Sequence, residues 1–137
     1  MTPIVYVAGR YRHYNLDGSL DIDAMLDEID DERMWAEVVA RAGGLPIRPL
    51  HNSVDLGESI PEISEGDWIA RQCALIRTLN PGNGKVLMRP GWDHEPVSEG
   101  SHAEHAMAQG CGIEIVHGMQ GADAVAARVR YLCGMAA

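Results

Sequence analysis

The residues best suited to chemistry gather between positions 98 and 104. Ser98, Gly100 and Glu104 stand in the order Ser-x-Gly-x-x-x-Glu, at the start of a run of small residues that favours a helix. A carboxylate near a helix N-terminus is kept ionised by the helix dipole and can act as a nucleophile. A glycine there permits close backbone approach, and the unpaired N–H groups of the first turn can hold a phosphate. The stretch therefore places a carboxylate close to a turn whose N–H groups could hold an anion.

Ser101 and Glu104 also allow a purely structural interpretation. They are spaced as S-x-x-E, the pattern of a capping box, in which the glutamate only bonds the N-terminus of its own helix. The loop arginines Arg10 and Arg12 have an equally plain alternative, as charges in contact with solvent. The spacing by itself leaves these alternatives open.

Alternating strands and helices must position these residues. Short apolar runs at 4–8, 45–48, 85–88 and 112–116 predict strands, and periodic stretches at 22–42, 64–80, 101–109 and 122–132 predict helices, the first of them either bent or in two pieces. Strict alternation is typical of a parallel sheet with helices on both faces and right-handed crossovers. We therefore expect a single α/β domain over 1–137, a flavodoxin- or Rossmann-like three-layer sandwich with strand order 2-1-3-4.

Three loops are expected, and two of them lie at the ligand-binding edge of the sheet. Ligands of such sheets bind beyond the carboxyl ends of the strands, where the strand order reverses. For the order 2-1-3-4 this edge receives residues 9–15 and 90–104, which are rich in Gly, His, Arg and carboxylates. Residues 49–63 show no period and mix Pro, Gly, Asn and Ser, which predicts a long loop that could be a lid.

Three segments together resemble the nucleoside 2-deoxyribosyltransferase-like superfamily, in particular its small phage and bacterial branch. They are VYVAGRYR at 5–12, MRPGW at 88–92 and SEGSHAEHAMAQG at 98–110, and the resemblance extends over residues 4–116. It implies cleavage of the N-glycosidic bond of a deoxynucleoside or deoxynucleotide. A glutamate attacks the anomeric carbon, and water or a second base then accepts the sugar.

The resemblance also assigns site residues. It implies that Glu104 is the nucleophile and that Tyr6 orients it. Residues expected to contact substrate or its 5′-phosphate are Gly9, Arg12, Trp92, Asp93, Ser98, Gly100 and Ser101. Arg12 and Ser98 favour a nucleoside 5′-monophosphate over the free nucleoside.

Two positions depart from the superfamily pattern. Arg10 stands where a proline is common, and Gly84 stands where an aspartate usually contacts base or sugar. The missing aspartate favours hydrolysis over base transfer. Two alternatives stay open: a nucleotide-binding or sensor module without turnover, and a phosphoribohydrolase of the kind with a PGG-x-GT-x-x-E motif.

The histidines near the motif raise the question of a metal. His94, His102 and His105 lie close in sequence to several glutamates, but no HExxH, HxxEH or paired-cysteine spacing is present. We therefore expect neither a metal ion nor another cofactor.

The net charge limits the possible binding partners, and the cysteines indicate the cellular compartment. The formal charge of −9 disfavours a nucleic-acid polymer or an anionic membrane, although a single phosphate can still be held locally. No apolar run approaches a membrane span, and three scattered cysteines are typical of reduced thiols, so we expect a cytoplasmic protein. The resemblance further implies a homodimer or larger homo-oligomer.

Overall fold

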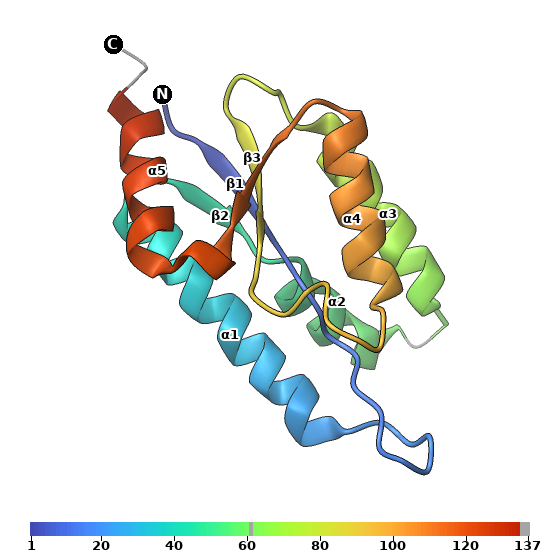
Figure 1. Ribbon diagram of the computed structural model, residues 1–137. Helices are drawn as coiled ribbons and strands as arrows, with labels where there is room; N and C mark the ends of the chain where they lie inside the picture. The colour runs from blue at the N-terminus through green and yellow to red at the C-terminus, as the bar shows by residue number, and fades with distance from the viewer. Residues whose placement is uncertain (61, 135–137) are drawn as a thin grey trace.

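A four-stranded parallel sheet forms the centre of the protein. The computed structural model describes residues 1–60 and 62–134, and its sheet has the order β2-β1-β3-β4 (Figure 1). The strands are β1 (Ile4–Ala8), β2 (Leu45–Ile47), β3 (Gly84–Met88) and β4 (Glu114–His117). All three strand pairings are parallel. The predicted fold class and strand order are confirmed.

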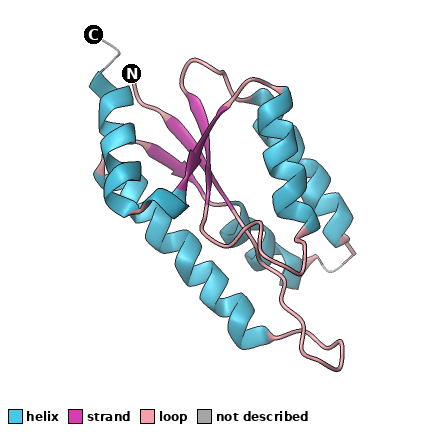
Figure 2. Cartoon of the chain, viewed as in Figure 1, coloured by secondary structure: helices cyan, strands magenta, loops and turns pink. Residues whose placement is uncertain are grey.

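Helices cover both faces of the sheet, and together with it they form three layers (Figure 2). On one face lie α1 (Ile22–Arg41) and α5 (Ala122–Gly134), and on the other lie α3 (Glu65–Thr78) and α4 (Glu99–Gly110). The remaining helix, α2 (Pro49–Ser59), follows β2 and lies near β1 and α1. No helix within 1–60 or 62–134 is long and apolar enough to cross a membrane.

Alternation along β1 divides its side chains between the two faces. Val5 and Val7 pack with residues of α1 and α5, whereas Tyr6 and Ala8 pack with residues of α3 and α4. All four are at most 1% exposed. Because successive residues of a strand point to opposite faces, the position of Tyr6 in β1 alone directs it toward α4.

Helix α1 is one continuous helix of 20 residues, which settles the alternative that the sequence left open. Asp21 caps its N-terminus by accepting a hydrogen bond from the Ala24 amide at 3.1 Å. Its buried face runs through Met25, Glu32 and Trp35. The fully buried Glu32 interrupts the apolar stripe of this face, which explains why the sequence suggested a bend or a break in the helix.

The prediction of a loop over 49–63 is wrong for its first part, because residues 49–59 form helix α2. Pro49 begins the helix, and the next two amides, of Leu50 and His51, donate to the Glu32 carboxylate at 2.8 and 3.1 Å. Burial raises the pKa of Glu32, while these two amide bonds oppose the rise. A cap supplied by a distant helix leaves no local sequence signal. Pro61, also within the predicted loop, lies outside the described residues.

Candidate active site

A cavity of about 660 Å³ lies at the carboxyl ends of the strands. Its walls come from the segment after β1, from α2 and α3, and from the loop and first turns that begin α4. Among the predicted site residues, those that line it are Gly9, Arg12, Ser98, Gly100, Ser101 and Glu104. The structure thus brings six of the nine predicted residues to one cavity, at the edge where the strand order reverses.

Glu104 lies on the inward face of α4, which it shares with Ser101 and Ala108. The residue is only 4% exposed, and the Tyr6 hydroxyl donates a hydrogen bond to its Oε2. Tyr6 is fully buried and does not itself line the cavity. It therefore lies behind Glu104 and holds the carboxylate at the cavity wall.

Burial dominates the ionisation of Glu104. Loss of solvent raises its pKa from 4.5 to about 7, although the hydrogen bond from Tyr6 and the charge of Arg89 lower it. The expectation that the helix dipole keeps this carboxylate ionised is therefore wrong, because Glu104 lies beyond the first turn of α4 and is desolvated. Burial and the neighbouring Glu104 raise the pKa of Tyr6, so its hydroxyl remains a donor.

The capping-box interpretation of Glu104 does not agree with the structure. The N-cap of α4 is Ser98, whose Oγ accepts a hydrogen bond from the Ser101 amide at 3.4 Å. The hydroxyls of Ser98 and Ser101 also lie 3.0 Å apart, within hydrogen-bonding distance. The carboxylate of Glu104 instead contacts Tyr6 on β1. Its position on α4 therefore serves the cavity and not the end of its own helix.

Gly100 is not required by the packing of the protein. A Cβ at this position would lie 3.5 Å from the Ile69 side chain, an ordinary van der Waals distance. Gly100 and Ile69 both line the cavity, so the extra methyl group would stand at its wall. Alanine could therefore replace this glycine without a clash, and its methyl group would lie at the cavity wall beside the N-terminus of α4.

Gly100→Ala is expected to fold and to raise the free energy of unfolding by about 0.5–1 kcal/mol, because alanine favours a helix. Its affinity for a phosphate-bearing ligand at this turn is expected to fall about tenfold or more, because the methyl group would block close approach of the anion. Chemical denaturation and titration calorimetry measure the two effects. Gly110→Ala is the matched control, since nothing lies within 4 Å of a Cβ at that end of α4. Wild-type affinity in Gly100→Ala would show that no ligand meets this turn.

Gly9 lines the cavity as expected and also has a structural role. A Cβ there would lie 2.7 Å from Nε of Arg89, so the glycine is needed to accommodate this guanidinium. Arg89 is 1% exposed and donates to the Arg10 carbonyl at 2.6 Å. It also pairs with Asp31 at 2.9 Å and Glu28 at 3.1 Å. Sequence reasoning missed Arg89, although a charged residue directly after a buried strand was the available signal.

The two arginines of the first loop differ in their surroundings. Arg12 forms an ion pair with Glu65, with its Nε 2.9 Å from the carboxylate, and its side chain is 34% exposed. Arg10 is 8% exposed, and its Nη2 donates to the carbonyls of His94 and Pro96. Both arginines line the cavity. The simple interpretation as solvated charges is therefore wrong for Arg10.

Trp92 and Asp93 do not line the cavity. The Trp92 ring stacks on His105 with a centroid distance of 4.5 Å and lies 5.1 Å from the His102 ring. Burial lowers the pKa of His105, while the nearby Asp93 opposes this. Among the side chains that the structure describes, no three of His, Cys, Asp or Glu are grouped to hold a metal ion.

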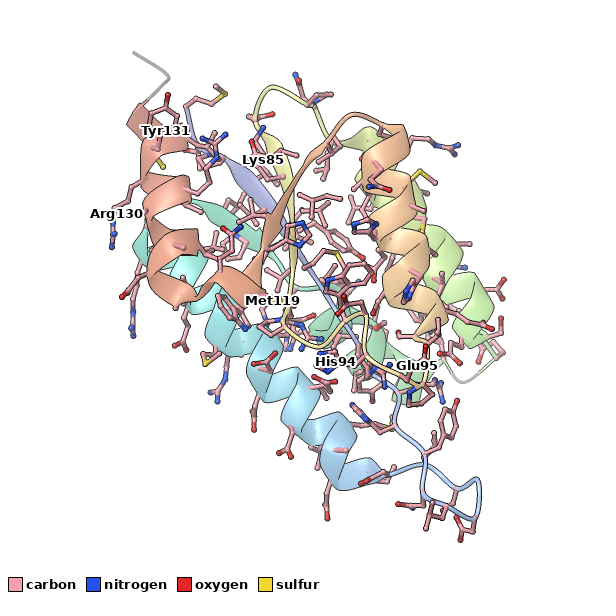
Figure 3. The ribbon with its side chains drawn as sticks, viewed as in Figure 1. Lys85, His94, Glu95, Met119, Arg130 and Tyr131 are labelled. Carbon is pink, nitrogen blue, oxygen red and sulfur yellow. The ribbon has the colours of Figure 1, made fainter. Side chains whose placement is uncertain are left out.

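Gly84 lies at the amino end of β3, paired with Ile4, whereas the cavity lies beyond the carboxyl ends. In Figure 3 the neighbouring Lys85 lies at one end of β3, and His94 and Glu95 lie beyond the other. A Cβ at Gly84 would come within 2.9 Å of the Asn80 carbonyl. A side chain at this position could not contact a ligand in the cavity. Gly84 therefore gives no reason to prefer hydrolysis over transfer.

The chain was compared with protein-family models, with curated proteins and with solved structures, and none of them matches it. Its function is therefore inferred from the cavity and from the residues that surround Glu104.

Proposed function

We propose that the protein cleaves the N-glycosidic bond of a nucleoside 5′-monophosphate, with Glu104 as the nucleophile. The observation that carries the proposal is the buried Glu104 carboxylate at the cavity wall, held by Tyr6. The N-terminus of α4 lies in the same wall, so a carboxylate and a phosphate-binding turn face one space. Cleavage of a bond between sugar and base uses both features.

The reaction proceeds in two steps. The ionised Glu104 carboxylate attacks the anomeric carbon, and the C–N bond breaks as the base leaves with its electron pair and takes up a proton from solvent water. Water then attacks the same carbon, loses a proton and releases the carboxylate. The Tyr6 hydroxyl donates to Oε2, so it fixes the carboxylate while leaving Oε1 for attack. A partly desolvated carboxylate is also a stronger nucleophile than one in water.

The test is release of free base from a panel of nucleotides, followed by chromatography. The panel holds dAMP, dGMP, dCMP and dTMP, the matching nucleosides, and the ribose counterparts that a phosphoribohydrolase would use. In parallel reactions a second free base is added as an acceptor of the sugar, because the position of Gly84 does not distinguish hydrolysis from base transfer. EDTA is present throughout, because the proposed steps use no metal.

We expect base release from at least one 5′-monophosphate, with a specificity constant tenfold or more above that of its nucleoside. Charge-assisted hydrogen bonds to a phosphate contribute about 1.5–3 kcal/mol each, which is roughly tenfold to a hundredfold per bond. If nucleotides bind without loss of their base, the protein is a binding or sensor module and the proposed reaction is wrong. Equal specificity constants for nucleosides and nucleotides would contradict only the predicted preference for a phosphate. The proposed reaction would stand.

A further inference from the structure

Arg10 is a buried cation for which no ion pair is found within the described residues. The residue is 8% exposed, close to the 1% of Arg89, yet Arg89 pairs with two carboxylates. The exposed Arg33 and Arg41 have carboxylate partners as well. Burying a charge without a counterion costs free energy, because neither water nor an opposite charge compensates for the lost hydration. Such a residue indicates a charge that arrives with a ligand.

The hydrogen bonds of Arg10 leave part of its guanidinium unused. Nη2 donates to the carbonyls of His94 and Pro96, which are neutral groups in the loop before α4. Nε is buried and has no partner among the described residues. A guanidinium presents five N–H donors in a fixed plane, a geometry that suits the oxygens of a phosphate. Donors and a net positive charge therefore remain for an anion.

The surroundings of Arg10 favour an anion. Arg10 lines the cavity together with Ser98, Gly100 and Ser101 at the N-terminus of α4, where backbone N–H groups carry partial positive charge. Arg12 lines the same cavity, but its charge is already paired with Glu65. Of the two arginines in this loop, Arg10 is the one whose charge is uncompensated.

We propose that Arg10, and not Arg12, binds the phosphate monoester of the nucleotide and sets the preference for nucleotides over nucleosides. This inference rests on the proposed function, because the phosphate belongs to the nucleotide whose base is released. The position also departs from the superfamily pattern, in which a proline is common. Arg10 links the anion to the loop before α4, since one guanidinium contacts both.

The experiment measures the dissociation constants of dAMP, dGMP, dCMP and dTMP and of their nucleosides by titration calorimetry. It uses Glu104→Gln protein, which is expected to release base too slowly to consume the ligands during the titration. When the substitution Arg10→Gln is introduced into this protein, the dissociation constant of each nucleoside divided by that of its nucleotide is expected to fall about tenfold or more. Added Arg12→Gln is expected to change it less than about threefold, since its charge is shared with Glu65. Arg41→Gln, a side chain 83% exposed near the end of α1, controls for the loss of one positive charge.

A second measurement keeps the arginine in place. In ¹⁵N-labelled Glu104→Gln protein, the Nε–H resonance of Arg10, assigned by its absence in Arg10→Lys, is expected to shift with the nucleotide and not with its nucleoside. An unmoved resonance, an unchanged ratio in Arg10→Gln, or an equal loss of affinity for both ligands would overturn the proposal. Equal loss would mean that Arg10 only holds the loop at His94 and Pro96.

Failure of this proposal can be told apart from failure of the proposed function. If the wild-type protein releases base but the ratio survives Arg10→Gln, the anion site is elsewhere and the reaction stands. If no base is released but the ratio collapses, Arg10 binds phosphate in a protein that does not cleave nucleotides.

Discussion

Glu104→Gln is expected to slow base release by several orders of magnitude while the protein remains folded. A neutral amide cannot form the glycosyl intermediate efficiently, whereas it has nearly the same shape as the carboxylate and can still accept the hydrogen bond from Tyr6. Single-turnover release of base, measured beside the thermal midpoint of each protein, gives both quantities. Near wild-type release from a folded variant would exclude Glu104 as the nucleophile.

The same variant is expected to be more stable than the wild type above pH 7. The folded protein holds the Glu104 proton more tightly than the unfolded chain does, because burial raises the pKa from 4.5 to about 7. The contribution of Glu104 to the free energy of unfolding is therefore most favourable below pH 4.5 and is lost as the pH rises to about 7. The full loss is on the order of 3 kcal/mol, the upper limit of what the substitution can recover. A variant that lacks activity but unfolds at a higher temperature at pH 8 would separate catalysis from a structural role.

The second large effect is expected in the pH dependence of base release. Because the nucleophile must be ionised, the rate should rise about tenfold per pH unit below pH 7 and then level off, so that it is roughly a hundredfold lower at pH 5 than at its plateau. A profile measured between pH 4.5 and 9 on the best nucleotide tests this. A rate that is flat through pH 7 would contradict Glu104 as the ionising group.

Tyr6→Phe is expected to move the midpoint of that profile to higher pH. The Tyr6 hydrogen bond lowers the pKa of Glu104, and a bond to a charged group contributes about 1.5–3 kcal/mol, which corresponds to one to two pH units. Phenylalanine keeps the ring that is buried in the sheet. Tyr131→Phe is the matched control, since this tyrosine lies on α5, far from His94 and Glu95 in Figure 3. A lower plateau without any shift would assign Tyr6 to packing alone.

The fold was predictable because its signals are local and regular. The apolar run at Ile4–Ala8 specified a strand, and alternation with helices specified a parallel sheet. The order β2-β1-β3-β4 is the expected arrangement with the first strand in the interior of the sheet. Helical spacing over 122–132 likewise specified α5, whose Val125 and Val129 are buried. Even the contact between Tyr6 and Glu104 was implied, but only through the superfamily resemblance.

The errors have a common physical cause, which is that distant side chains decide the outcome. Helix α2 exists where a loop was predicted because Glu32, in α1, caps its first amides. In the same way, the need for glycine at position 9 went unnoticed, because it accommodates the guanidinium of Arg89, which directly follows β3. Neither partner is close in sequence to the residue that it affects, so no local pattern records the contact.

The charges of Glu104 and Arg10 show most clearly which properties the sequence determined and which the tertiary structure decided. From its sequence, Glu104 was a carboxylate that a helix dipole keeps ionised, and Arg10 was an ordinary loop charge. Residue types and spacing determined that a carboxylate and two arginines would reach one edge of the sheet. Only the tertiary structure decided that Glu104 is desolvated, that Arg12 is paired and that Arg10 is buried without an ion pair in the described chain. Solvation depends on every surrounding atom, and those atoms are brought together only by folding.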